Sequence, residues 1–321
     1  MAHLRPVRPE TPKDAVASSG SWLHWLIPRR PGLGGSLPAL QSRDFRLFWF
    51  GQALSLIGTW VQSVAQQWLV LKLTGSAFDL GLVTTAQFTP MLILSLVGGA
   101  VADRMPKRNL LLATQVASAL LAVLLGTLVR TGQVRYWEVV VIAMMLGTVN
   151  AFYTPARQAF LPELVPRDAL LNAVALNSAI FNAARVVGPA IGGILIATIG
   201  LSLNFYINAV SFVAVLGSLL LIHPRPRAAA SGENLRKNVA EGLRYILDTP
   251  VVYTILALIG VASLFGLNFT TLMPLFANYV LHVGSSGYGF LMAAMGVGSL
   301  TSAILLAFFN RRDLTRRFIY T

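Results

Sequence analysis

The sequence predicts an all-α protein that crosses a membrane several times. The chain has 321 residues, of which 55% are hydrophobic and only 12% are charged, whereas soluble proteins are nearer one quarter charged. The apolar residues gather in eight runs with almost no charge. Each run suits a helix of ~20 residues across a ~30 Å hydrocarbon core. Backbone groups in lipid must be satisfied within their own segment, so these runs are expected to be helices.

The eight apolar runs predict eight membrane-spanning helices. Buried helices of a large soluble protein would need amphipathic partners, and the chain has almost none. We therefore expect membrane-spanning helices near residues 46–70, 80–102, 109–129, 137–156, 176–199, 201–222, 251–273 and 287–309.

The basic residues indicate the orientation of these helices. Of the 25 Lys and Arg, 21 lie in the amino-terminal tail and in the loops that follow even-numbered helices. The opposite side has only Lys72, Arg130 and Arg135, and Arg185 lies within a helix. Basic loops stay cytoplasmic, so we expect a multi-pass plasma-membrane protein, in a bacterium the inner membrane, with a cytoplasmic amino terminus. The net charge of +13 is then a topology signal and does not indicate a nucleic-acid partner.

Two segments outside the spans are expected at the cytoplasmic face. Residues 1–43 are rich in Pro, Ser and Arg, which predicts a disordered basic tail, and they lack a signal peptide. The linker 223–250 contains the run NLRKNVAEGLRYIL, in which Leu235, Val239 and Leu243 share one helical face. This pattern suits an amphipathic helix on the membrane surface, and the alternative is a helix packed on the loop ends.

An internal repeat organises the chain. Residues from Gly81 can be laid over those from Gly289 at an offset of 208, with a Ser- and Gly-rich entry, an apolar helix and a basic hairpin in both copies. The plan predicts a six-helix bundle over 44–222 and a partial second bundle over 251–321, with its first two helices and the start of the third. About 110 residues of a second repeat would be missing, so the sequence is expected to be truncated after the eighth helix.

Three motifs carry a family resemblance. The loop GGAVADRMPKRN resembles the signature loop of the major facilitator superfamily, with Pro106 where glycine is usual. Proline fixes a tight turn by locking φ. The run ARVVGPAIGG on the fifth helix resembles an exporter-associated motif, and FYTPARQAFLPELVPRDALLNAVALNSA resembles the drug-efflux and enterobactin-exporter-like branch. The matching residues are Gly99, Asp103, Arg104, Lys107 and Arg108 in the loop, and Gly188, Pro189, Gly192 and Gly193 on the helix.

The resemblance implies conformational roles for these motifs. Asp103, Arg104 and Arg157 are expected to form a latch that holds the two halves in an outward-open state, or else the charges only orient the hairpin. A carboxylate at this helix end can cap a neighbouring helix or pair with Arg157. Small residues at 184, 188 and 192 let helices approach closely, and Pro189 can bend the helix. This helix is either a rocking surface or a static packing element.

Polar side chains within the spans are the candidates for a substrate cavity. Arg185 lies inside the fifth helix, and none of the 12 acidic residues lies in a span to pair with it. Intramembrane charge is costly and usually functional, so Arg185 is expected to attract an anionic or polar substrate, unless it snorkels to the membrane face. Gln66, Asn150 and Asn182 are expected to line the same cavity, and the alternative is bonding from helix to helix.

The absent motifs restrict the function further. The sequence has no cysteine, no phosphate loop, no zinc-type histidine pair and no nucleophile triad. We therefore expect no enzyme activity, no cofactor and no metal. The fold expected from the resemblance is the major facilitator fold, exporting a drug-like or siderophore-like small molecule by alternating access. Coupling to protons, as in an antiporter, is implied by the resemblance alone. The alternatives are a truncated non-transporting fragment and a membrane scaffold or sensor with the same fold.

Overall fold

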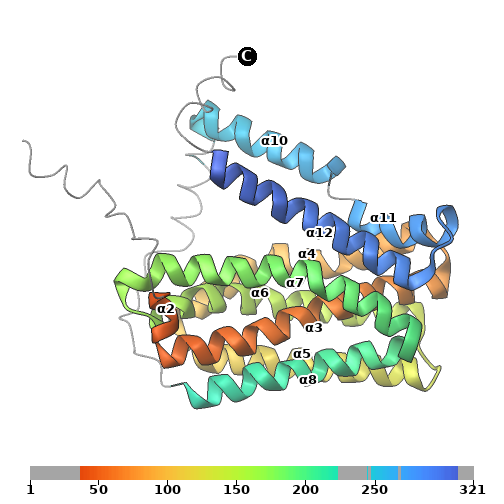
Figure 1. The fold of residues 1–321 in the computed structure, drawn as a ribbon, viewed down its shortest axis with the longest axis horizontal. Helices are drawn as coiled ribbons and strands as arrows, with labels where there is room; N and C mark the ends of the chain where they lie inside the picture. Colours follow the sequence, from red (N-terminus) through yellow and green to blue (C-terminus); the bar gives the residue numbers. More distant parts are fainter. Residues whose placement is uncertain (1–36, 223–243, 245–246, 267–268, 310–321) are drawn as a thin grey trace, which may run out of the picture. The chain divides into compact units, whose positions relative to one another are not determined.

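The described part of the protein is helical throughout. The computed structural model describes residues 37–222, 244, 247–266 and 269–309. The predicted runs are helical where they are described, and the described residues of the seventh run belong to α10 and α11, with residues 267–268 outside the described part (Figure 1). The long helices are α3 (Arg43–Thr74), α4 (Ala77–Arg104), α5 (Lys107–Arg130), α6 (Tyr136–Leu164), α7 (Leu170–Ile199), α8 (Leu201–Leu221), α10 (Pro250–Gly266) and α12 (Gly284–Phe309). The short ones are α2 (Pro38–Gln41), η3 (Arg167–Ala169), α11 (Phe269–Leu275) and the π-helical η4 (Phe276–Val280).

Length and composition allow five helices within the described residues to cross a membrane. These are α4, α5, α6, η3 together with α7, and α8. Although α3 is 32 residues long, it is not among these five. Its sequence places Gln52, Gln62, Gln66 and Gln67 among the apolar residues, and amide side chains lower hydropathy.

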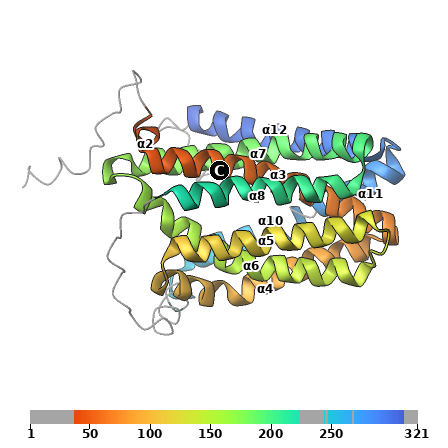
Figure 2. The same cartoon turned by 90° about the horizontal axis from the view of Figure 1, so that it is seen from below.

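Helices α3 to α8 form a six-helix bundle in which most of the main contacts join helices that are not neighbours in sequence. Helix α4 packs on α6, α5 packs on α6 and α8, and α3 packs on both α7 and α8 (Figure 2). Helix α12 lies against α7 and supplies the principal contact of the partial second bundle. Helix α7 therefore lies between α3 and α12.

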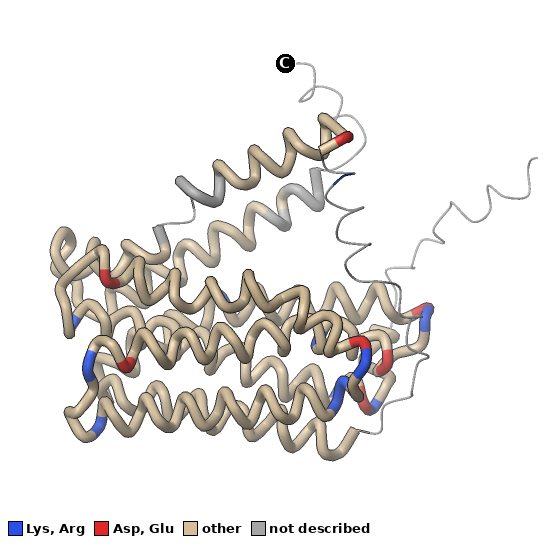
Figure 3. Tube along the Cα trace, turned by 180° about the vertical axis from the view of Figure 1, so that it is seen from behind, with Lys and Arg blue, Asp and Glu red and all other residues tan. Residues whose placement is uncertain are grey.

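The two ends of the bundle are built from different turn residues. Glycines with positive φ, at 75, 132, 200 and 284, connect helices at one end, which we call the glycine end. At the other end Pro106 precedes α5 and Pro166 precedes η3, and this basic end also carries Arg104, Lys107 and Arg108. Charged residues gather at both ends, with long uncharged stretches of helix between them (Figure 3). Pro106 has a φ of −57° and joins α4 to α5 in a tight hairpin, as the sequence predicts.

The last residues of the predicted disordered tail are ordered, which corrects the boundary at 43. Pro38–Gln41 forms α2, and Ala39 is fully buried. The Ala39 amide donates to Asn172 Oδ1 at 3.2 Å, and the Ser42 hydroxyl donates to the Leu164 carbonyl at 2.6 Å. Contacts with the α6–α7 connection thus order this segment. Residues 1–36 and the amphipathic run at 235–243 lie outside the described residues.

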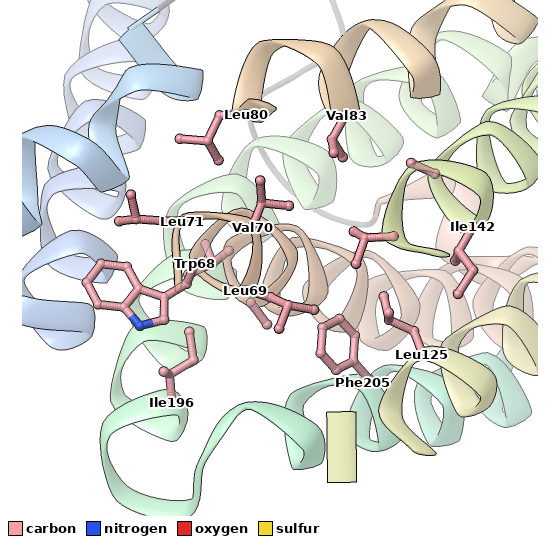
Figure 4. Packing of buried hydrophobic residues seen from close by; sticks show 14 of the residues in the cluster. Trp68, Leu69, Val70, Leu71, Leu80, Val83, Leu125, Ile142, Ile196 and Phe205 are labelled. Atoms are coloured by element: carbon pink, nitrogen blue, oxygen red, sulfur yellow. The ribbon is translucent and has the colours of Figure 1, made fainter. Parts of the chain in front are cut away.

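Each glutamine of α3 bonds to a different helix, and together these bonds position α3 at the centre of the fold. Gln62 Oε1 accepts a hydrogen bond from buried Asn208 on α8 at 2.7 Å. Gln52 Oε1 accepts from the Tyr153 hydroxyl on α6 at 2.9 Å. Gln66 donates to Gln87 on α4 at 3.5 Å, and Gln67 accepts from Tyr288 on α12 at 2.6 Å. Around the glycine-end half of α3, buried apolar side chains of the neighbouring helices complete the core (Figure 4).

Candidate functional site at the α7–α12 seam and the basic end

One face of α7 packs closely on α3 because its small residues leave room. A Cβ added to Gly188 would collide with the Cβ of Trp60. A Cβ on Gly192 would lie 3.2 Å from the Cα of Val61. Ala184, one turn before Gly188, is also buried. The small-residue stripe read from the sequence is therefore a contact within the six-helix bundle.

The next face of α7 packs on α12 with even less space. A Cβ on Gly193 would lie 2.7 Å from the Cα of Gly289, and one on Gly289 would lie 2.6 Å from the carbonyl oxygen of Pro189. Two turns further along α12, a Cβ on Gly296 would lie 3.1 Å from the Arg185 carbonyl oxygen. We call the contact of α12 with α7 and α3 the seam. Within the GPxxGG motif, Gly188 and Gly192 thus contact α3, whereas Pro189 and Gly193 contact α12.

Tyr288 adds a polar link to the seam near the glycine end. Its side chain is 0% exposed, its hydroxyl donates to Gln67 Oε1 at 2.6 Å, and its ring stacks on Trp68 with centroids 5.9 Å apart. Close by, a Cβ on the turn residue Gly75 would lie 3.2 Å from the Tyr279 hydroxyl of η4. Side chains of α3, η4 and α12 therefore meet at this end.

Burial along α12 falls off toward the basic end. On the face of α12 that forms the seam, Tyr288, Met292 and Gly296 are buried, whereas Ser299 and Leu300 beyond them are half-buried. Helix α7 has exposed side chains near both of its ends, among them Leu171 and Ile199. Along α12, the seam is thus most tightly packed near the glycine end.

Arg185 lies at the midpoint of α7, beside this seam. Its side chain is half-buried, and it shares a helical stripe with Pro189 and Gly193, at spacings of four and eight residues. Within the described residues the acidic side chains lie at or near helix ends, and no ion pair joins one of them to Arg185. The structure places this cation where α7 leaves the packed part of the seam.

The signature loop at the basic end holds its neighbours through two of its basic residues. Lys107 forms an ion pair with Glu163 of α6 at 3.1 Å. Arg108 donates from Nε to the Leu219 carbonyl at 2.6 Å and from Nη2 to the Leu220 carbonyl at 2.8 Å. These carbonyls belong to the last turn of α8, where a cation is favoured. Asp103 and Arg104 are exposed, and a Cβ on Gly99 would meet no atom within 4 Å.

Arg157 has partners other than the expected aspartate. Its Nη1 donates to Asn177 Oδ1 of α7 at 3.2 Å, and its guanidinium lies 5.9 Å from the centre of the Tyr153 ring. Its buried Nε has no hydrogen-bond partner. Across the described part of the chain, no ion pair joins Arg157 to Asp103. The latch therefore stays a prediction.

The three polar cavity candidates have different surroundings. Gln66 is buried and bonds Gln87 on α4, which is the helix-to-helix role that the sequence left open. Asn182 is half-buried and donates to the Ser178 carbonyl of its own helix at 2.9 Å. Asn150 is half-buried on α6, and it has no hydrogen-bond partner in the described residues. All three stay predicted cavity residues.

Sequence reasoning missed the pair formed by Gln67 and Tyr288. The repeat contained a signal, because position 288 corresponds to Leu80 at the offset of 208, so a tyrosine replaces a leucine in the second copy. The side chains of Leu80 and Tyr288 are buried in the same hydrophobic cluster. For metals, the described residues contain no group of three His, Cys, Asp or Glu side chains suited to hold an ion.

The helical topology and the glycine-packed seam define the class of protein. The fold is that of the major facilitator transporters. It resembles a bacterial homologue of the human lysosomal transporter Spinster, solved inward-facing and unoccupied, with a TM-score of 0.67 and 16% identity over 86% of this chain and 64% of that one. A family model described as "Transmembrane secretion effector" matches residues 34–320. The chain belongs to this family, whose relatives are transporters and not enzymes.

Characterised relatives include exporters and transporters of different compounds. The chain is 30% identical to the staphyloferrin A transporter of Staphylococcus aureus, over 81% of this chain and 66% of the relative. It is 30% identical to the multidrug efflux pump Tap of Mycolicibacterium fortuitum, over 79% of this chain and 64% of the relative. It is 25% identical to the enterobactin exporter EntS of Shigella boydii, over 81% of this chain and 62% of the relative. The chain thus spans just under two thirds of the length of these relatives.

Proposed function

We propose that this chain supplies the six-helix half and the first helices of the second half of a secondary transporter. Its function is export of a small molecule by alternating access. The observation that carries the proposal is the seam, in which α12 packs closely on α7 and α3 near the glycine end and is less buried toward the basic end. Contacts through glycine backbones allow one bundle to rock on another, because no long side chains interlock there.

The charges support a cytoplasmic basic end and an inward-facing conformation. Cytoplasmic loops are rich in Lys and Arg, and the basic end carries Arg104, Lys107 and Arg108. A seam packed at the opposite end then closes the extracytoplasmic side. Asp103 and Arg157 form no ion pair among the described residues, which fits the same state, since the family resemblance assigns their pairing to the outward-open state.

Arg185 is proposed as the substrate-binding cation, with Asn150 and Asn182 as polar neighbours of the cavity. A cation in the middle of a span is stabilised by a polar or anionic ligand in the cavity. The relatives transport or export compounds described as staphyloferrin A, enterobactin and multiple drugs. We propose a siderophore-like or drug-like substrate for this chain, with protons as the coupling ion.

An export assay tests this function. Cells that lack their own exporters are loaded with labelled compounds from both classes, and efflux is measured with the chain, with the Arg185→Ala variant and with the Arg185→Lys variant. We expect Arg185→Ala to reduce efflux at least tenfold and Arg185→Lys to retain part of it. Arg130→Ala, which removes a cation at the glycine end, is the control and should leave efflux unchanged. Efflux equal to that of empty cells would favour the non-transporting fragment or scaffold.

A further inference from the structure

We propose that Tyr288, Gln67 and Trp68 form a lock that holds the seam closed at the glycine end and must open for release on that side. We call these three residues the Tyr288 lock. The proposal rests on the proposed function for its place in transport. The lock itself is a property of the α3–α12 contact and can be measured without a substrate.

The geometry of the Tyr288 lock is that of a closed contact. The hydroxyl of Tyr288 donates to Gln67 Oε1 at 2.6 Å, and its ring lies nearly parallel to Trp68, with 16° between the ring planes. The next residue, Gly289, is the one whose backbone contacts Gly193 of α7. The directional bond to α3 and the close backbone contact with α7 therefore fix the same turn of α12 from two sides.

The Tyr288 lock differs from the rest of the seam in how it responds to separation. Glycine and apolar contacts lose packing gradually when two helices part. A buried hydrogen bond is either made or broken, and a broken one leaves both polar groups unsatisfied until water reaches them. The bond between Tyr288 and Gln67 therefore favours a fully closed or a fully open seam over intermediate positions.

The strength of such a bond suits a switch. A net hydrogen bond changes an equilibrium by about two- to twelvefold, and bonds between membrane helices lie in a similar range. Substrate binding can overcome a bias of this size. In the first repeat, Leu80 occupies the corresponding position and is buried in the same cluster without a hydroxyl. The hydroxyl is thus specific to the second copy, on the helix that crosses the seam.

The absence of cysteine makes a labelling experiment possible, because one introduced cysteine reports alone. Met292 is 7% exposed and lies one turn after Tyr288 on the seam side of α12, so Met292→Cys is the reporter. The labelling rate with a membrane-impermeant maleimide is measured in right-side-out and inside-out vesicles, without substrate. Labelling after denaturation gives the amount of chain.

In the reporter background, Tyr288→Phe is expected to raise the labelling rate about fivefold. The increase should occur only from the side of the glycine end. Phenylalanine keeps the ring and its stacking on Trp68 and removes only the hydroxyl. The matched control is Tyr253→Phe on α10, which removes the hydroxyl of an exposed tyrosine away from the seam and should leave the rate unchanged.

A second variant tests the partner of Tyr288. Gln67→Leu should raise the rate to a similar degree, and the double variant should exceed neither single variant by more than about twofold, because both remove one bond. An unchanged rate in Tyr288→Phe would overturn the lock, as would an equal rise in Tyr253→Phe. The labelling assay needs no substrate, so it is independent of the export assay. An unchanged labelling rate in Tyr288→Phe together with normal efflux would reject only the lock. A raised labelling rate in Tyr288→Phe together with no efflux would reject only the transport proposal.

Discussion

Helices α4 and α12 are copies of one plan, and they differ in what covers them. At the repeat offset, Gly81 of α4 corresponds to Gly289 of α12. Gly289 packs against the backbone of Gly193 and Pro189, whereas a Cβ on Gly81 would meet no described atom within 4 Å. Helix α4 instead packs on α6 through another face, where Gly98 contacts Ala151 and Gly147 contacts Gln87. The corresponding glycines thus differ, because Gly289 is tightly packed and the space around Gly81 is open among the described residues.

The largest expected effect tests this difference directly. Gly289→Leu should lower the free energy of unfolding by about 3 kcal/mol, because backbone atoms of α7 cannot move aside for the new side chain. Gly81→Leu should change it by less than about 0.5 kcal/mol, because the space is open. Thermal unfolding in detergent, followed by circular dichroism, measures both. Equal losses in the two variants would contradict the distinction between α4 and α12.

Two adjacent glycines of α4 sharpen the comparison within one helix. Gly98→Ala should cost about 2 kcal/mol, since its Cβ would collide with the Ala151 carbonyl group of α6. Gly99→Ala should be neutral or stabilising by about 0.5 kcal/mol, because alanine favours the helix and the site is open. The same melting assay measures both, and a destabilised Gly99→Ala protein would reveal a contact that the comparison leaves out.

A matched pair on α12 gives a smaller effect. Gly296→Ala should cost about 1 kcal/mol, because its Cβ would lie 2.9 Å from a methyl group of Val186 and 3.1 Å from the Arg185 carbonyl oxygen. Gly298→Ala, where no atom lies within 4 Å, should gain about 0.5 kcal/mol from helix propensity. If Gly298→Ala proved the more harmful of the two, α12 would be rotated relative to the seam described here.

An equally small effect concerns the hairpin that follows α4. Lys107 pairs with Glu163, whereas the corresponding residue of the second copy is Thr315. Lys107→Thr should lower stability by about 1 kcal/mol, because the two side chains are only 16% and 9% exposed and Glu163 would lose its partner at the end of the bundle. The loss should shrink at high salt, because screening weakens the pair. Glu163→Gln serves as the reciprocal control, and a loss that is independent of salt would assign the effect to packing instead of charge.

The sequence was sufficient to predict the helices, because charge is excluded from a span and apolar length sets its extent. It also predicted the Pro106 hairpin, since a locked φ restricts the turn. It could not choose partners for polar side chains. Periodicity placed Arg157 at the end of a helix, but the bond to Asn177 depends on how α6 and α7 cross.

The sequence also could not predict which helix each glycine of α7 contacts. A stripe of small residues predicts that another helix packs closely on it, but it does not identify that helix. In the structure, Gly188 and Gly192 contact α3, whereas Gly193 contacts α12. Gln66 shows the same limit, because an amide in a span suits both a cavity and a helix contact until its neighbour Gln87 is known.

The glutamines of α3 have a consequence for biosynthesis. This helix leaves the ribosome before every other long helix described here, yet its amides bond to helices made later. In order of synthesis their partners are Gln87, Tyr153, Asn208 and Tyr288. Until those partners arrive, an isolated α3 in lipid would carry unsatisfied amides. The four amides of α3 therefore all have their native partners only once α12 has been synthesised.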